Sequence, residues 1–193
     1  MKAIVFIDVQ NDFVKCGKLA FGYPVEDNLQ KVVDYAKQRA DDADCKIYAT
    51  RDTHKATKWI EKDCAQVAVG YLATLEGQKL PVEHCVEGTS GWQIVDTLME
   101  VLLGKATFIN KPTFGSYDIA DIVAEDVEGT LDEIVICGYD LSICVLANAV
   151  LLRAKFPNVK ITVKADLCGD VDKNAFDAAV KVLQMQQIDV EGI

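Results

Sequence analysis

Three side chains that could carry out nucleophilic catalysis lie at or just beyond apolar segments of the chain. Asp8 ends the first apolar run, Lys111 follows the run 106–109, and Cys144 lies shortly after the run 134–137. A lysine ammonium beside a cysteine lowers the pKa of the thiol by favouring its charged form, and a carboxylate can move the proton. These residue types together therefore predict a nucleophile, Cys144, served by Asp8 and Lys111.

Each of these residues also has an ordinary structural interpretation. Free cysteine is among the most buried residue types, so a lone Cys144 taken by itself is better explained as a core residue. Asp8 could cap the loop that it precedes, and Lys111 could be a solvated lysine before Pro112. Only the occurrence of all three at strand ends of one sheet favours the catalytic interpretation.

A second group of residues has the donor types of a divalent metal site. Asp52 and His54 are separated by one residue, so both side chains point the same way in an extended segment. His84 is the only other histidine of the chain. One carboxylate and two imidazoles can hold a metal and leave positions open for water or substrate. The alternative is that Asp52 caps a helix and both histidines are surface residues.

Short apolar runs alternate along the chain with longer segments of helical periodicity. Unbroken apolar runs of this kind are typical of strands buried on both faces of a parallel sheet. We therefore expect an α/β fold with a doubly wound, mainly parallel sheet and helices on both faces, in which ligands bind beyond the carboxyl ends of the strands. The expected strands are 2–9, 46–50, 106–109, 134–137, 159–163 and 188–190, and the expected helices begin near Asp27 or cover 92–102, 119–125, 142–156 and 176–183.

The segment 133–157 places the candidate nucleophile within this architecture. A buried strand reaches Gly138, a few polar residues follow, and the apolar stretch 142–156 contains neither glycine nor proline. Cys144 then lies in the first turn of a helix, where the helix dipole and the free backbone N–H groups favour a thiolate.

The remaining segments and the bulk composition limit the possible classes of protein. With 193 residues the chain fits a single domain over 1–193, in which 10–24 is expected to be a long surface loop and 55–83 an excursion with short helices. No stretch approaches the roughly 20 uninterrupted apolar residues of a membrane span. The formal charge of −10 argues against nucleic acid or an anionic membrane as partners.

The cysteines and the missing motifs narrow these classes further. Seven cysteines are scattered without a C-x-x-C pair, and the first residues have no signal-peptide cleavage site. We expect reduced thiols in a cytoplasmic protein. No G-x-G-x-x-G follows an expected strand, so no nucleotide cofactor is expected.

Several spaced motifs carry a family resemblance that covers most of the chain. They are FIDVQNDF with Asp8, TRDTH with Asp52 and His54, HCVEGTSG with His84, INKPTFGSY with Lys111, and the G-x-x-x-x-x-C-V pattern that starts at Gly138. The sequence resembles the isochorismatase-like family of cysteine hydrolases, and its metal-site motifs resemble the nicotinamidase branch. The resemblance implies the Rossmann-like three-layer fold of that family.

The resemblance also implies a reaction. Asp8, Lys111 and Cys144 would be the catalytic triad, and Cys144 would attack an amide carbonyl to form a thioester that water hydrolyses. The backbone N–H groups of Asp140 and Cys144 would form the oxyanion hole, with a cis peptide bond between Tyr139 and Asp140. Nicotinamide would be converted to nicotinate and ammonia.

The metal and the substrate pocket follow from the same resemblance. Asp52, His54 and His84 would ligate a divalent metal, commonly zinc with iron or manganese as alternatives, that binds the pyridine nitrogen. Phe13 would face the substrate ring, and Tyr139 would also bind substrate. The family further implies a homo-oligomer.

Two departures from the family pattern leave other substrates open. The turn before Cys144 reads Asp140-Leu141-Ser142 in place of a small residue followed by threonine, and an inward-pointing Asp140 would raise the pKa of Cys144. The second departure is that residues 80–84 read Leu-Pro-Val-Glu-His and lack the aromatic-Pro-x-His pattern usual in the family. For the second aromatic wall of the pocket, the candidates are therefore Trp59 and Tyr71. The alternatives are therefore a hydrolase of another small amide or ureido compound, and a catalytically silent member that binds a ligand.

Overall fold

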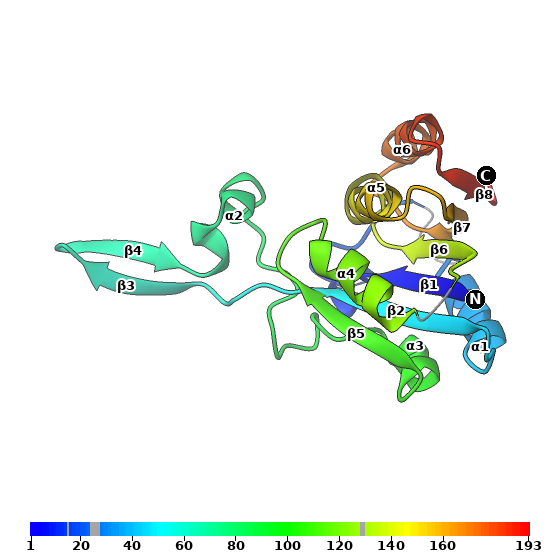
Figure 1. Cartoon of the computed structure of the whole chain (residues 1–193). Coiled ribbons are helices and arrows are strands. Elements are labelled where there is room, and N and C mark those ends of the chain that lie inside the picture. The colour runs from blue at the N-terminus through cyan, green and yellow to red at the C-terminus, as the bar shows by residue number, and fades with distance from the viewer. Residues whose placement is uncertain (15, 24–27, 128–129) are drawn as a thin grey trace.

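A parallel sheet runs through the centre of the protein (Figure 1). In the computed structural model, which describes residues 1–14, 16–23, 28–127 and 130–193, this sheet has six strands in the order β5-β2-β1-β6-β7-β8. All of its pairings are parallel. The strands are β1 (Lys2–Ile7), β2 (Cys45–Asp52), β5 (Ala106–Lys111), β6 (Glu133–Gly138), β7 (Lys160–Cys168) and β8 (Asp189–Glu191). The predicted doubly wound, mainly parallel α/β fold is therefore confirmed.

β1 lies inside the sheet because its side chains are apolar on both faces. Residues 3–7 are all buried, and Val5 pairs with Tyr48 of β2 on one side and with Ile136 of β6 on the other. Helices must cover both faces of such a strand. Because the neighbouring strands run in the same direction, the polar residues that follow β1, β2, β5 and β6 meet at one edge of the sheet.

Helices cover the two faces of the sheet in two groups (Figure 1). One group is α1 (Asn28–Arg39) with α3 (Asp96–Leu102), and the other is α4 (Tyr117–Asp126) with α5 (Leu146–Lys155) and α6 (Lys173–Met185). Each helix buries side chains at helical spacing, as α6 does with Phe176, Ala179, Val180 and Leu183. This arrangement leaves the carboxyl edge of the sheet open.

Some predicted elements differ in detail from the structure. The expected helix 142–156 begins instead with a π-helical turn, Leu141–Val145, that leads into α5. The expected helix 92–102 starts only at Asp96, because the indole N–H of Trp92 donates to Thr53 Oγ1 at 2.9 Å and holds Trp92 outside the helix. The expected helix start at Asp27 lies outside the described residues.

The loop 10–24, expected at the surface, is partly internal. Asp12 and Phe13 form part of a short 3₁₀ turn (Asn11–Phe13), and both side chains are buried. The carboxylate of Asp12 accepts a hydrogen bond of 2.8 Å from the backbone N–H of Cys85, which lies far along the chain. This contact ties the loop to the segment that carries His84.

The excursion 55–83 contains a β-hairpin that the sequence analysis did not predict. β3 (Lys58–Lys62) and β4 (Ala65–Val69) pair antiparallel, and a 3₁₀ turn (Tyr71–Ala73) and α2 (Leu75–Lys79) follow. Figure 1 shows the hairpin projecting from the rest of the molecule. We call β3 and β4 the arm. Nearly all arm residues are exposed, so the pattern of buried residues that identifies a strand in sequence is missing.

The helices and the cysteines of the described residues give information on the class of protein. Within the described ranges, no helix is both long enough and apolar enough to cross a membrane. All seven cysteines are free, and Cys85, Cys137, Cys144 and Cys168 are buried. This agrees with the expectation of reduced thiols.

Glu133 binds the amino-terminal ends of three neighbouring strands together. Its carboxylate lies 2.7 Å from Lys2 Nζ and 2.9 Å from Lys160 Nζ, and it accepts a hydrogen bond of 2.8 Å from Thr162 Oγ1. Burial alone would raise the pKa of Glu133, but these three partners outweigh it and lower the pKa to about 2. The ion pairs therefore stabilise the fold above about pH 4.3, the pKa of an unfolded glutamate, and this stabilisation is lost as the pH falls through about 2.

We expect Glu133→Gln to lower the free energy of unfolding at neutral pH by about 1 kcal/mol. The difference from the parent protein should shrink as the pH falls below about 4, because both chains then lack the charge. Urea unfolding followed at a series of pH values measures this. Glu100→Gln, at an exposed position of α3, is the control, and equal pH dependence of the two variants would contradict the prediction.

Candidate active site

The ammonium group of Lys111 lies where three strand ends meet. Its Nζ is 2.6 Å from Asp8 Oδ2, 3.6 Å from Asp52 Oδ1 and 3.5 Å from Cys144 Sγ. Lys111 is fully buried, which alone would lower its pKa, but Asp8, Cys144 and Asp52 raise the pKa of this ammonium above its ordinary value. The three residues predicted to act together, Asp8, Lys111 and Cys144, thus form one buried cluster with a permanently charged lysine.

Asp8 is held in an uncommon backbone conformation just after β1. Its φ is 50°, in the left-handed region that residues other than glycine rarely adopt. Thr50 of β2 fixes it twice: Thr50 Oγ1 accepts a hydrogen bond of 3.0 Å from the Asp8 N–H and donates one of 2.6 Å to Asp8 Oδ1. Burial raises the pKa of Asp8, and Lys111 opposes this shift. Asp8 is therefore a more ready proton acceptor than an exposed aspartate.

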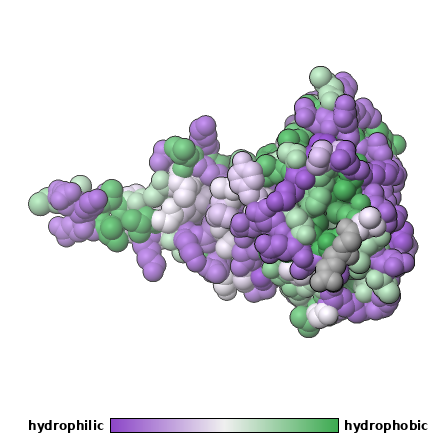
Figure 2. All heavy atoms as spheres, viewed as in Figure 1, coloured by the Kyte–Doolittle hydropathy of each residue, from purple (hydrophilic) through white to green (hydrophobic). Residues whose placement is uncertain are grey.

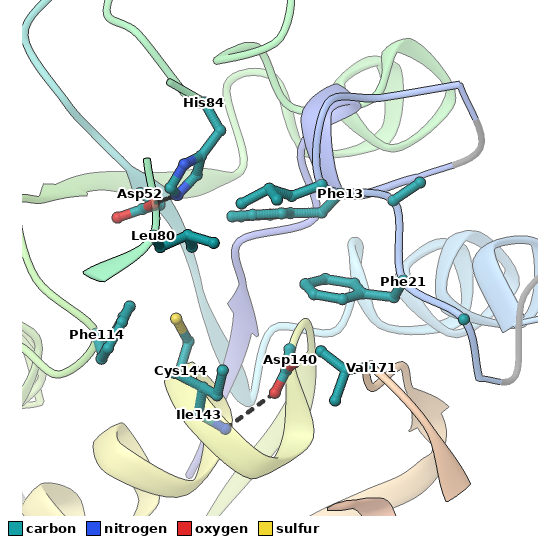
Figure 3. A pocket seen from close by; sticks show the side chains of 13 residues that line it. Phe13, Phe21, Asp52, Leu80, His84, Phe114, Asp140, Ile143, Cys144 and Val171 are labelled. Carbon is teal, nitrogen blue, oxygen red and sulfur yellow. Dashed lines mark hydrogen bonds and ion pairs between the residues drawn. The ribbon is translucent and has the colours of Figure 1, made fainter. Parts of the chain in front are cut away.

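Cys144 is buried in the π-helical turn, with its sulfur directed into a pocket (Figure 3). Burial raises the pKa of the Cys144 thiol, Lys111 lowers it, and Asp8 and Asp52 raise it again. The expected effect of Lys111, which favours the thiolate, is present, but burial and the two carboxylates outweigh it. Cys144 needs a proton acceptor in order to react, and the neighbouring Asp8 can be that acceptor.

The turn before Cys144 requires a glycine and presents a free backbone donor. Gly138 has a φ of 120°, and a Cβ at this position would lie 2.1 Å from the carbonyl oxygen of Ile7. The peptide bond between Tyr139 and Asp140 is cis, as the resemblance implied. Among the described residues, the backbone N–H of Asp140 donates to no other backbone group. Asp140 directly precedes the π-helical turn Leu141–Val145, which contains the backbone N–H of Cys144.

The side chain of Asp140 caps the turn that carries the cysteine (Figure 3). Asp140 Oδ1 accepts hydrogen bonds from the Ile143 N–H at 2.9 Å and from Ser142 Oγ at 3.1 Å. Asp170 holds the same serine, with Oδ1 2.9 Å from Ser142 Oγ and Oδ2 accepting from the Ser142 N–H at 2.9 Å. Burial and then the charge of Asp170 raise the pKa of Asp140 to about 7. Asp140 thus organises the turn, because its carboxylate caps the residues that follow it.

Four side chains converge in a cluster that fits a metal ion. Ligand atoms of Asp52, His54, Glu76 and His84 all lie within 4.8 Å of one another. His54 Nε2 is 2.9 Å from Asp52 Oδ2 and 3.3 Å from Glu76 Oε1, and His84 Nε2 is 3.2 Å from the same Asp52 oxygen. His54 Nε2 and Glu76 Oε1 are buried and have no hydrogen-bond partner among the described residues. Two imidazole nitrogens and two carboxylates facing a common centre are a suitable donor set for a divalent cation.

Residues behind the cluster fix its ligands. Gln10 holds the backbone of Asp52 from both sides, donating to its carbonyl oxygen at 2.9 Å and accepting from its N–H at 2.7 Å. His84 Nδ1 lies 2.8 Å from the carbonyl oxygen of Val82. A hydrogen bond donated from Nδ1 leaves Nε2 as the free lone pair, which is the usual support for a metal-binding histidine.

A pocket of about 330 Å³ connects the metal cluster to Cys144 (Figure 3). Phe13 and Phe21 stack with ring centroids 5.1 Å apart on one side, and Phe114 lies on the other. Asp52 and His84 lie at one end of the pocket, and Cys144 and Asp140 at the other. The mostly apolar walls with a few polar groups are typical of a small-molecule site.

Several residues expected around the substrate lie elsewhere. Tyr139 is not part of the pocket lining among the described residues: its hydroxyl donates to Asn28 Oδ1 at 3.3 Å, and its ring packs behind Phe21 with centroids 5.7 Å apart. Trp59 is on the arm and 64% exposed, and Tyr71 packs against the ring of His54. The aromatic residues that sequence reasoning missed are Phe21 and Phe114.

Other residues of the site also escaped sequence reasoning. Glu76 lies on the short helix α2, far from every quoted motif, and Thr50 and Gln10 act through hydrogen bonds between different strands. Thr50 and Gln10 lie within the quoted motifs TRDTH and FIDVQNDF, so their position at strand ends could have marked them. Glu76 had no comparable indication in the sequence.

Comparisons with known proteins agree with this geometry. The chain matches the model of the isochorismatase domain over residues 2–191. It is 30% identical to the nicotinamidase of Saccharomyces cerevisiae over 176 residues, which cover 78% of this chain and 80% of that protein.

Solved structures share the same fold. Nicotinamidase/pyrazinamidase from Bacillus subtilis superposes with a TM-score of 0.79 at 19% identity, covering 99% of both chains. Pyrazinamidase of Pyrococcus horikoshii in complex with zinc gives a TM-score of 0.77 at 20% identity, covering 100% of this chain and 99% of that one. At these identities the likeness establishes the fold.

We expect Asp140→Asn to change the pH dependence of stability. A carboxyl whose pKa rises from about 3.9 in the unfolded chain to about 7 in the folded one stabilises the fold only while protonated, so this stability is lost as the pH rises through 7. Asparagine keeps the capping oxygen and does not titrate. The variant should therefore gain stability relative to the parent as the pH rises from about 4 to about 7, measured by urea unfolding. Asp34→Asn, at an exposed position of α1, should show no such gain.

We expect Glu76→Gln to weaken binding of zinc or manganese by about tenfold or more, because it removes one charged ligand. Titration calorimetry or competition with a chelator measures the affinity. Glu100→Gln is the matched control far from the cluster. An unchanged affinity in the Glu76 variant would show that the cation is held by the other three residues alone.

Proposed function

Because the chain belongs to the isochorismatase family, we propose that it is a nicotinamidase, which hydrolyses nicotinamide to nicotinate and ammonia through a thioester of Cys144. The observation that carries this proposal is that Lys111 Nζ lies within 3.6 Å of Asp8, Asp52 and Cys144. The same pocket also borders the metal cluster.

The buried cluster supplies the proton transfers of such a reaction. Cys144 Sγ attacks the amide carbon as its proton passes to Asp8, and the backbone N–H groups of Asp140 and Cys144 receive the developing oxyanion. Asp8 then donates the proton to the departing amine, which leaves as ammonia, and a thioester remains. Asp8 next takes a proton from water, which attacks the thioester, and returns it to the sulfur as the acid is released. Lys111 stays protonated throughout and stabilises the anionic forms.

The other residues of the pocket orient the substrate. The rings of Phe13 and Phe21 form an apolar wall suited to a flat aromatic ring. Asp52, His54, Glu76 and His84 would hold a divalent cation, with zinc proposed, and the cation would accept the lone pair of a pyridine nitrogen. Tyr139, behind Phe21, would position that ring and not touch the substrate itself.

A second substrate class is favoured by one observation. Asp140 lines the pocket, and its Oδ2 is buried without a hydrogen-bond partner among the described residues. An additional N–H donor on the substrate, as in a ureido compound, could pair with it. Ammonia release measured over a panel of nicotinamide, other small amides and ureido compounds separates the two classes.

Further parts of the proposal concern the state of the protein. We propose a single domain over 1–193, a cytoplasmic location, in keeping with seven free cysteines, and a homo-oligomeric assembly.

We expect Cys144→Ala to reduce ammonia release from nicotinamide by about 10³-fold or more, because no other group in the cluster can form the covalent bond. Cys64→Ala, at the exposed tip of the arm, is the matched control and should retain full activity. Unchanged turnover in the Cys144 variant would refute the proposed mechanism. A parent protein that is inactive on nicotinamide but hydrolyses another amide would refute only the assignment of nicotinamide as the substrate.

A further inference from the structure

The arm has one face that combines an apolar centre with charged ends. Strand alternation and the pairing of Ile60 with Val67 and Lys58 with Val69 place these four side chains on the same side of the hairpin, together with Lys62. Ile60, Val67 and Val69 are 44%, 39% and 37% exposed. Figure 2 shows apolar side chains gathered on the arm away from the rest of the molecule. We call these five residues the arm face.

The arm has too little packing of its own to explain its stability. A two-stranded hairpin is marginally stable in water unless another element covers one face. Among the described residues, β3 and β4 pair only with each other, and their main contact with another element is that of β4 with the turn that follows it. The arm face is therefore the kind of surface that a second molecule covers.

A groove of matching character lies over α5, beside the active-site pocket. It is lined by Phe114, Ile143, Leu146, Val150 and Leu151. Phe114 and Ile143 are 41% and 37% exposed, and they also line the active-site pocket. We call this surface the α5 groove.

Charge on the neighbouring helix complements the arm. α4, which packs beside α5, contains Asp118, Asp121, Glu125 and Asp126 and no basic residue. Of these, Asp121 already pairs with Lys155 of α5 at 2.7 Å. The arm face carries two lysines, in a chain whose formal net charge is −10. An apolar strip with lysines at its ends thus matches an apolar groove beside an acidic helix.

We propose that the arm face of one chain docks in the α5 groove of a second copy, and that the second copy returns the contact through a two-fold axis. Figure 1 shows the arm pointing away from α5 of its own chain, so the groove that it fills belongs to another molecule. Because each chain contributes one arm face and one α5 groove, two such contacts related by a two-fold axis form a closed dimer. Both surfaces of both chains are then covered. The partner's arm would then border the mouth of the pocket at Phe114 and Ile143. This assembly does not depend on which amide the enzyme hydrolyses.

The oligomeric state of three variants tests the proposal. Ile60→Glu on the arm face and Val150→Glu in the α5 groove should each raise the dimer dissociation constant by about 100-fold or more. Gln66→Glu adds the same charge on the opposite face of the hairpin and should leave it unchanged. Sedimentation velocity over a range of concentrations measures the constant, and circular dichroism with thermal unfolding establishes that each variant is folded.

A mixing experiment distinguishes arm-to-groove docking from other contacts. The Ile60→Glu chain keeps its groove and the Val150→Glu chain keeps its arm, so a mixture should form a mixed dimer through one intact contact, more stable than either variant alone. A charge exchange is the second measurement: Lys58→Glu should weaken the dimer, and Asp118→Lys on the other chain should restore it. A monomeric parent protein, a groove variant that dimerises normally, or a mixture without mixed dimers would overturn the proposal.

Discussion

The site depends on one buried ammonium group with anionic partners on several sides. Burying a lysine without a partner is costly, so Lys111 requires Asp8 and Asp52, and they in turn require Lys111. These residues follow or end β1, β2 and β5, and the parallel pairing of the strands brings them together. The fold and the site therefore depend on each other. The register of the sheet sets the distances among the charged groups. The charged groups in turn limit which residues can occupy the strand ends. Burial, together with the charges of Asp8 and Asp52, raises the pKa of the Cys144 thiol against the opposing effect of Lys111.

Much of this arrangement could be predicted from the sequence. Unbroken apolar runs identified the central strands, and polar residues directly after these runs identified Asp8, Asp52 and Lys111 as neighbours. The rest could not be predicted, for physical reasons. Glu76, on α2, reaches the metal cluster, and Phe21 reaches the pocket from a loop. The course of these segments depends on tertiary contacts, such as that between Asp12 and Cys85. The arm has no buried face, so hydrophobic periodicity does not reveal it.

The turn before Cys144 differs from the family pattern at Asp140 and Leu141, and hydrogen bonds within the turn accommodate this difference. Sequence reasoning treated Asp140 as an added negative charge near the sulfur. In the structure its carboxylate caps the π-helical turn, and Ser142 and Asp170 complete a hydrogen-bonded group around it. Asp140 is thus the capping residue of the turn, and Leu141, where the family pattern has threonine, is buried inside it. The side chain of Asp140 serves the turn, while its backbone N–H donates to no other backbone group among the described residues.

The metal cluster has a consequence for the long segment between β2 and α3. Asp52 and His54 precede this excursion, Glu76 lies within it, and His84 ends it. A cation bound there would link the two ends of this segment at its base. Closing a long loop in this way lowers the conformational entropy of the unfolded chain, as a covalent cross-link does. The arm grows from this closed loop, and its direction is set at the base. Metal binding would therefore change how rigidly the base holds the arm. The arm surface would then depend on whether the metal site is occupied, although the two lie far apart.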